Sequence, residues 1–179
     1  MCECELFFFI SDILNNTETL SKLNTEWDTL APIMLMYKDV ADDPKLVSRK
    51  IRDFYFGDKE INEDTRLELA QIWTDIFFIA YAQGEAKTLC KQLPVYFYAF
   101  KHAPKTSIWE FFDYRLDTFF KKDGKPATFS YHMDELQYLF PIKNEEEFAN
   151  MDMEITKEDD DFPLSQGMVK LWTSFAETG

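Results

Sequence analysis

The sequence predicts an α/β fold that is mostly helical, with one or two strands. Residues 44–57 and 165–178 carry apolar side chains at helical spacing, which is typical of helices that bury one face. Residues 95–100, VYFYAF, form a β-branched and aromatic run behind Pro94, as buried strands do. The chain has 179 residues, 46% of them hydrophobic, which is enough for one domain, or part of one, with a sizeable core.

The first third of the chain contains two recognisable helix starts. Asn16 can cap a short helix that runs through Leu23. Asp43 followed by Pro44 predicts an N-cap and a first helical residue, and Gly57 predicts the end of that helix. Between them, the apolar residues 27–37 are interrupted by Pro32, so their structure is the least defined by pattern.

Residues 62–91 predict a long helical element. Its apolar positions Leu69, Trp73, Ile76, Phe77 and Ala80 recur at helical spacing, and we expect a break near Gly84 before a second piece that reaches residue 91. An aromatic stripe of this kind more often packs against a core than lines a ligand groove.

The last third contains the predicted strand at residues 95–100 and a final helix. Residues 108–112 fit either helix or strand, and residues 121–124 predict a turn. The final helix places Met168, Leu171, Trp172 and Phe175 at i, i+3, i+4 and i+7, so it should dock by one apolar face. His102, beside Pro104 in polar surroundings, is expected to be exposed and to have low functional weight.

The charge balance excludes several functions. The chain has 19 basic and 33 acidic residues, a net charge of -14, which repels nucleic acid and anionic lipid. The acidic runs at residues 145–147 and 158–161 fit solvated loops, and neither has the spacing of a calcium loop.

Cysteine usage and apolar runs indicate no metal site, cofactor or membrane segment. Cys2, Cys4 and Cys90 form no paired framework, and Cys2 with Cys4 lacks the second ligand pair of a zinc site. The apolar run at residues 6–10 follows acidic residues and is too short for a signal peptide or a membrane span. The cellular compartment stays open.

Residues 129–140, FSYHMDELQYLF, hold the most informative pattern. His132 stands where an acidic, aromatic helix should begin, and Asp134 and Glu135 fit its first turn, where they meet the positive end of the helix dipole. An imidazole with a pKa near ~6.5 can act as a general base. Spacing alone leaves open a purely structural histidine.

This segment resembles the histidine segment of the type-B carboxylesterases, the cholinesterase-like branch of the α/β-hydrolases, and an insect-type esterase is the nearest comparison. Residues 93–100 resemble the late strand that precedes the histidine loop in that family, and residues 168–179 resemble its terminal helix. The likeness extends through residues 27–37 and 51–57 and covers nearly the whole chain. The resemblance implies one partial domain over residues 1–179, an incomplete C-terminal part of an α/β-hydrolase.

The triad that the resemblance implies is incomplete here. The pattern Gly-x-Ser-x-Gly is absent, because none of the five glycines is followed by a serine two residues later, and no adjacent glycines could form an oxyanion loop. In this fold the order is serine, acid, histidine, so a chain beginning after the serine keeps the acid and His132. Glu3 or Glu5 stands where the family's acid is expected, and Glu3 is slightly favoured. No glycine follows either residue, which departs from the family's pattern and leaves Glu5 or neither as alternatives.

Two functions from different classes follow. The first is a C-terminal fragment of a carboxylic ester hydrolase that supplies the triad histidine, lacks the serine and is inactive alone. Its partner would be a small carboxylic ester in the full-length parent, and apolar surface without a partner would favour self-association. The second is a non-catalytic, cholinesterase-like binding module. A truncated product without function is a further alternative.

Overall fold

The computed structural model describes residues 7–108, 130–142 and 153–179, and divides them between two compact units. Unit 1 contains Glu85–Gly179 together with Met1–Cys4, and unit 2 contains Glu5–Gly84. The boundary falls inside helix α6, at Ala80–Leu89. The prediction of one partial domain over residues 1–179 stays a prediction.

The regular elements in the described part of unit 2 are all helices. Its elements, in chain order, are α1 at Phe7–Leu14, α2 at Thr17–Thr25, α3 at Trp27–Met34, α4 at Pro44–Tyr55, the 3-10 helix η1 at Glu63–Thr65, α5 at Arg66–Thr74 and the π-helix η2 at Asp75–Ile79. Both predicted caps are confirmed: the Asn16 side chain accepts from the Thr19 amide, and Asp43 accepts from the Leu46 amide. Gly57 ends α4 with a φ of 57°.

The core of unit 2 lies among helices α1 to α5. Trp27, 5% exposed, donates its indole N–H to the Ser48 carbonyl at 2.7 Å, and its ring meets Phe56 edge-on at 6.1 Å. The Asn24 amide pairs with both backbone groups of Ile61, at 2.8 and 2.9 Å, and thereby fixes the chain between α4 and η1. Further buried hydrophobic residues of unit 2 are Ile10, Leu23, Ala31, Leu35, Ile61, Leu69, Ala70 and Ile72.

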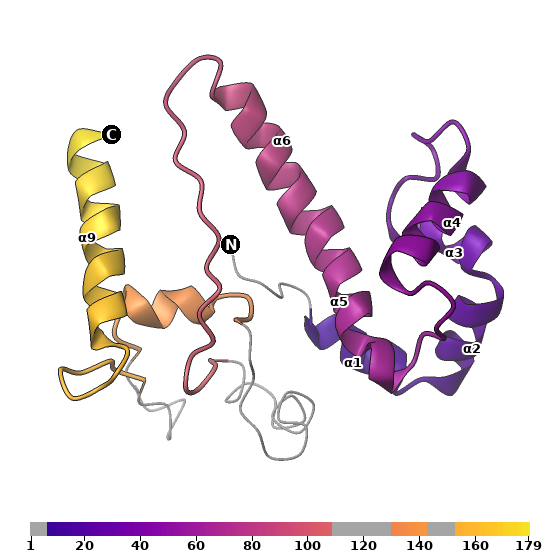
Figure 1. Cartoon of the computed structure of the whole chain (residues 1–179), viewed down its shortest axis with the longest axis horizontal. Coiled ribbons are helices and arrows are strands. Elements are labelled where there is room, and N and C mark those ends of the chain that lie inside the picture. The colour runs from indigo at the N-terminus through magenta and orange to yellow at the C-terminus, as the bar shows by residue number, and fades with distance from the viewer. Residues whose placement is uncertain (1–6, 109–129, 143–152) are drawn as a thin grey trace. The chain divides into compact units, whose positions relative to one another are not determined.

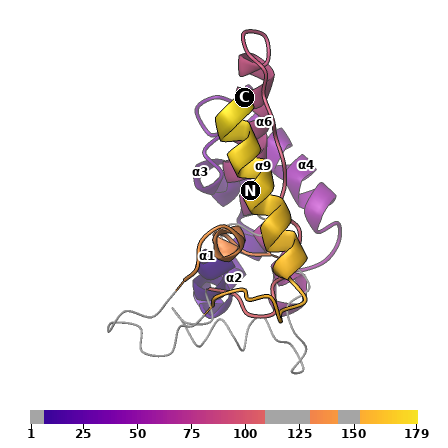
Figure 2. The same ribbon diagram turned by 90° about the vertical axis from the view of Figure 1, so that its left-hand side faces the viewer.

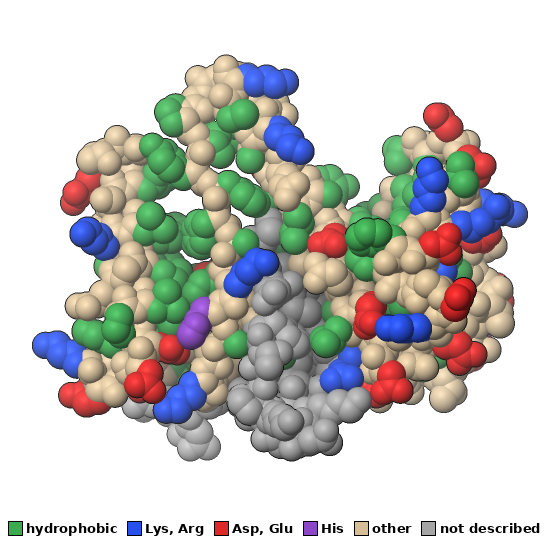
Figure 3. All heavy atoms as spheres, viewed as in Figure 1, with side chains coloured by type: hydrophobic (Ala, Val, Ile, Leu, Met, Phe, Trp, Pro, Cys, Tyr) green, Lys and Arg blue, Asp and Glu red, His purple; other side chains and the backbone are tan. Residues whose placement is uncertain are grey.

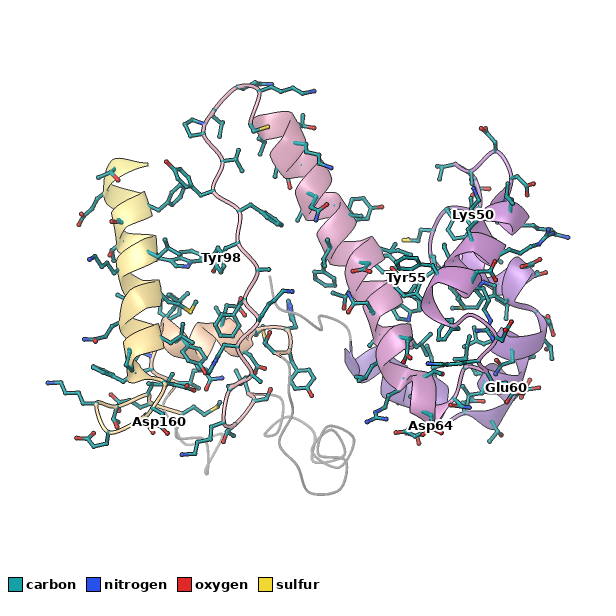
Figure 4. All side chains as sticks on the ribbon, viewed as in Figure 1. Lys50, Tyr55, Glu60, Asp64, Tyr98 and Asp160 are labelled. Atoms are coloured by element: carbon teal, nitrogen blue, oxygen red, sulfur yellow. The ribbon has the colours of Figure 1, made fainter. Side chains whose placement is uncertain are left out.

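The long element at residues 66–89 is confirmed as helical, but its irregularity lies elsewhere than predicted. Helix α6 continues through Gly84, while residues 75–79 form the π-helix η2. Asp75 at the start of η2 accepts from Tyr55 at 2.6 Å and from Gln71 at 2.7 Å. Tyr55, labelled in Figure 4, reaches from α4 toward this helix, and both its burial and the Asp75 carboxylate raise the pKa of its hydroxyl.

Unit 1 contains the 3-10 helix η4 at Asp134–Tyr138 and helix α9 at Phe162–Thr178. Figures 1 and 2 show η4 lying crosswise beside the N-terminal end of α9. The predicted strand at residues 95–100 is not found: these residues are extended, but they join no ladder, and the isolated bridge between Ile142 and Met153 lies elsewhere in the described residues. A strand exists only when a neighbouring strand supplies the hydrogen bonds, and an apolar pattern cannot supply that neighbour.

The extended segment packs against α9 instead. Alternate residues of the segment point to one side, and they meet α9 at helical intervals. Tyr96 meets Phe175 at 5.7 Å between ring centroids, Tyr98 meets Trp172 at 6.5 Å, and the Trp172 indole donates to the Tyr98 hydroxyl at 3.1 Å. Phe100, Tyr138 and Met168 form the buried end of this row.

Much of the apolar surface of α9 is exposed. Met168 is buried as predicted, but Leu171, Trp172 and Phe175 are 56%, 49% and 56% exposed. Hydrophobic side chains gather along α9 and the extended segment beside it in Figure 3. The one-sided docking predicted for this helix is therefore only partly found within unit 1.

Candidate active site

His132 lies on a tight turn directly before η4. The Asp134 amide donates to the Tyr131 carbonyl at 3.1 Å, which closes the turn around His132. Met133 follows with a φ of 69°, a left-handed conformation that non-glycine residues adopt only when the surroundings hold it. The sequence prediction that a helix begins just after His132 is thus confirmed, although the helix is a short 3-10 turn.

The turn is fixed from inside by the carboxylate of Asp134. This side chain is 0% exposed and accepts three hydrogen bonds, from the Ser107 hydroxyl at 2.6 Å, the Tyr131 amide at 2.8 Å and the Ile108 amide at 3.3 Å. Burial raises the pKa of Asp134 to about 6, against the lowering effect of those three donors. Asp134 stands in the first turn of η4, as expected, and two of its three donors come from a distant segment.

The residues before His132 are also buried and anchored. Ser130, 0% exposed, donates its hydroxyl to the Phe100 carbonyl at 2.8 Å, and Tyr131 is 2% exposed. The end of the extended segment and the start of the histidine turn are therefore joined. His132 itself is only partly buried. An accessible imidazole thus stands on a backbone that is held from both sides.

The far end of η4 is tied to α9. Tyr138, 1% exposed, donates its hydroxyl to Asp161 at 2.8 Å, and its carbonyl accepts from Ser165 at 2.8 Å. Burial and the Asp161 carboxylate both raise the pKa of the Tyr138 hydroxyl. The Gln137 amide donates to the Thr106 carbonyl at 3.3 Å. These contacts connect the histidine turn to the last helix.

The other histidine, His102, has a partner that the sequence did not indicate. It is exposed, as predicted, but its Nε2 lies 2.9 Å from Asp161 Oδ1, and its ring meets the Tyr138 ring edge-on at 5.7 Å. A hollow of about 450 Å³ lies beside it, lined in part by Lys105, Asp159 and Asp160. His132 and Asp134 do not line this hollow.

A profile described as the carboxylesterase family matches residues 1–179. The chain belongs to the carboxylesterase family. Members of this family have the α/β-hydrolase fold, so the predicted α/β class holds for the family, while the described residues themselves are mostly helical. The resemblance of the histidine segment to the type-B carboxylesterases is confirmed by this match.

Curated relatives of this carboxylesterase chain carry hydrolase names. Esterase FE4 of Myzus persicae is 25% identical over 174 residues, covering 94% of this chain and 28% of that protein. Acylcarnitine hydrolase of Mus musculus is 27% identical over 136 residues, 76% of this chain and 21% of that protein. Cocaine esterase of Homo sapiens is 27% identical over 129 residues, which cover 72% of this chain and 20% of that protein. The chain thus spans less than a third of the length of these relatives.

The structure reaches only part of the predicted triad. Glu3 and Glu5 lie outside the described residues, as does the pair Cys2 and Cys4. Cys90, which is described, is exposed and unpaired with another cysteine. A search of the described ranges finds no group of three or more potential metal ligands, and none of the helices there is long and apolar enough to cross a membrane.

Sequence reasoning missed Ser107, Ser130 and Asp161. Ser107 and Ser130 are small polar residues whose burial depends on contacts 27 and 30 residues away along the chain. Asp161 belongs to an acidic run that the sequence predicts to be a solvated loop, yet it accepts from both Tyr138 and His102.

Proposed function

We propose that this chain is the C-terminal part of a carboxylic ester hydrolase and that His132 is the base of its serine triad. The observation that carries the proposal is the family match over residues 1–179, which takes in the turn that carries His132. The names of the relatives, esterases and an acylcarnitine hydrolase, support a carboxylic ester as the substrate class. The nucleophile would come from a part of the polypeptide outside this sequence.

In this role His132 would accept the proton of the serine hydroxyl as the serine attacks the ester carbonyl. It would then return that proton to the departing alcohol and activate a water molecule that releases the acyl group. A partly buried imidazole on an anchored turn suits this work, since a base must hold its position while its proton moves. Glu3 is the proposed acid that orients the imidazole, and Glu5, which also precedes the apolar run that begins at residue 6, is the alternative.

The chain alone should not turn over esters, because its sequence contains no Gly-x-Ser-x-Gly and no paired glycines for an oxyanion loop. The first measurement is hydrolysis of p-nitrophenyl acetate by the 179-residue chain, compared with free imidazole at equal concentration. We expect equal rates. A chain that hydrolyses the ester faster than imidazole and loses that activity in His132→Gln would contradict the missing-nucleophile proposal.

The second measurement uses the longer polypeptide read from the same transcript upstream of Met1. We expect it to contain Gly-x-Ser-x-Gly and to hydrolyse the ester, with His132→Gln lowering kcat by at least about 10³-fold. His102→Gln is the matched control, because it removes the other histidine of the chain and should leave kcat within about twofold. Equal loss in the two variants would remove His132 from the triad.

The second candidate function is a non-catalytic binding module of the same family. The absent nucleophile pattern favours it, and so does the exposure of Tyr96, Phe97, Leu171 and Phe175, which offer apolar surface to a partner. The same exposure supports the prediction that the isolated chain self-associates. A transcript that starts at Met1, with no serine motif upstream, would favour this function over the esterase.

A further inference from the structure

We propose that Asp134 is a positioning residue: its buried carboxylate joins residues 107–108 to the turn at residues 131–134 and so fixes the backbone that carries His132. The catalytic meaning of this role rests on the proposed function, in which His132 is the triad base. The geometry itself does not depend on that function, because it concerns only how the turn is held.

The carboxylate connects two segments that are far apart in the chain. Its Oδ1 accepts from the Ser107 hydroxyl and the Ile108 amide, 27 and 26 residues earlier. Its Oδ2 accepts from the Tyr131 amide, three residues earlier and adjacent to His132. One side chain therefore supplies acceptors on both sides, and each hydrogen bond to a buried carboxylate is of the stronger, charge-assisted kind.

No other side chain meets these donors. An asparagine has only one carbonyl oxygen, and its other group is an NH₂ donor. In either orientation that NH₂ would face a backbone N–H, of Tyr131 or of Ile108, so a donor would oppose a donor. A glutamate is longer by one methylene in a site where Asp134 is 0% exposed. The requirement is thus for a carboxylate at this length.

The three hydrogen bonds to the Asp134 carboxylate, which we call the clamp, are needed because the backbone of the turn is strained. Met133 holds a left-handed conformation at φ 69°, and a non-glycine residue keeps it only where the neighbouring structure leaves no alternative. Tyr131, on the other side of His132, donates its backbone amide directly to the Asp134 carboxylate. Releasing Asp134 would let the turn relax and would move the imidazole between them.

The chain offers an internal control, since His102 and His132 are its only histidines. Each has a different carboxylate nearby in the structure: Asp161 contacts His102 at 2.9 Å, and Asp134 holds the turn of His132. Imidazole resonances in proton–carbon NMR spectra of the 179-residue chain can be assigned with His102→Gln. Spectra are recorded at pH 7.5, above the pKa of about 6 of Asp134.

The crossed pair Asp134→Asn and Asp161→Asn gives the test. We expect Asp134→Asn to shift and broaden the His132 resonance and to speed exchange of the Tyr131 and Ile108 amides, while His102 stays unchanged. Asp161→Asn should shift His102 much more than His132, because it removes the direct contact with His102 and reaches His132 only through Tyr138 at the far end of η4. The proposal is overturned if Asp134→Asn leaves the His132 resonance and both amides as they are in the parent chain.

A general loosening of unit 1 would move both histidines, so a milder variant is needed. Ser107→Ala removes one of the three donors and no charge, and we expect a smaller shift at His132 alone, with far-UV circular dichroism unchanged. If Asp134→Asn unfolds the unit, Ser107→Ala decides: a folded variant without any His132 shift refutes the clamp. These spectra need no serine, so an inactive longer polypeptide would end the esterase proposal without touching this one.

Discussion

Unit 2, at Glu5–Gly84, and unit 1, which contains Glu85–Gly179, are stabilised by different kinds of contact. In unit 2, helices pack on helices around a shared apolar core, with Trp27 and Phe56 at its centre. In unit 1, the described chain has one long helix, and the rest is held by single buried polar groups such as Asp134 and by aromatic pairs such as Tyr98 with Trp172. The first arrangement spreads stability over many contacts, and the second concentrates it in a few.

This difference teaches where function can be placed. A turn that carries a general base must keep one geometry although its residues are exposed to substrate, and directional hydrogen bonds achieve this better than apolar packing. The cost is that each such group matters individually. The stability of unit 1 should therefore fall sharply when a buried polar group is replaced and only slightly when an exposed apolar side chain is removed. The stability of unit 2 should depend most on its buried apolar side chains.

The largest expected effect is at Trp27. Trp27→Ala removes a buried ring and leaves the Ser48 carbonyl without its indole donor, so the free energy of unfolding should fall by about 3–5 kcal/mol. Trp172→Ala, at a residue 49% exposed, should lose only about 1 kcal/mol. Urea unfolding followed by circular dichroism measures both. Equal losses would mean that the two tryptophans are equally supported and that the contrast between the units is false.

The elements that the sequence predicted well are those whose determinants are local. Asn16, Asp43 and Gly57 act within a few residues of themselves, and the structure places a helix end at each. The predicted break at Gly84 is wrong, because an isolated glycine in a helix costs only about 1 kcal/mol and neighbouring turns can carry it. The π-helix at residues 75–79 has no comparable local signal.

The strand at residues 95–100 failed for the opposite reason. Its pattern describes a segment suited to a sheet, but the hydrogen-bonding neighbour is a property of another segment. The candidate site was likewise predictable only where its determinants are local. The pattern around His132 identified the turn and the family, whereas the hydrogen bond from Ser107 to Asp134 joins residues 27 positions apart. No periodicity in the sequence encodes a contact of that kind.

A second, smaller effect comes from pH. Because the pKa of Asp134 rises from 3.8 to about 6 on folding, the folded state binds its proton more tightly. The stability that this protonation contributes is fully present below about pH 4 and is lost as pH rises through 6, a difference of roughly 3 kcal/mol. Other carboxylates also titrate, so the comparison is between the parent chain and Asp134→Asn.

We expect the free energy of unfolding, measured in urea at pH 4.5 and pH 7, to fall more between these values in the parent chain than in Asp134→Asn. Asp159→Asn removes an equal charge from an exposed turn whose donors lower the pKa of that carboxyl, and it should leave the slope above pH 4.5 unchanged. If Asp134→Asn shows the same slope as the parent, the buried carboxylate does not titrate in this range.

The smallest expected effects distinguish the two units by sign. Gly57 follows α4 with a φ of 57°, and its amide donates to the Arg52 and Asp53 carbonyls, so alanine there meets open space but a strained backbone. Gly57→Ala should therefore destabilise the chain by about 1 kcal/mol.

Gly167 lies inside α9, also with open space around its Cα and without a positive φ. Gly167→Ala should stabilise that helix by about 0.5–1 kcal/mol, since it removes backbone freedom from the unfolded chain. Thermal unfolding of the two variants separates the cases, because the substitution and the available space are the same and only the backbone conformation differs. A gain in Tm for Gly57→Ala would show that α4 does not end in the left-handed turn, and the core contacts of Phe56 beside it would then need another explanation.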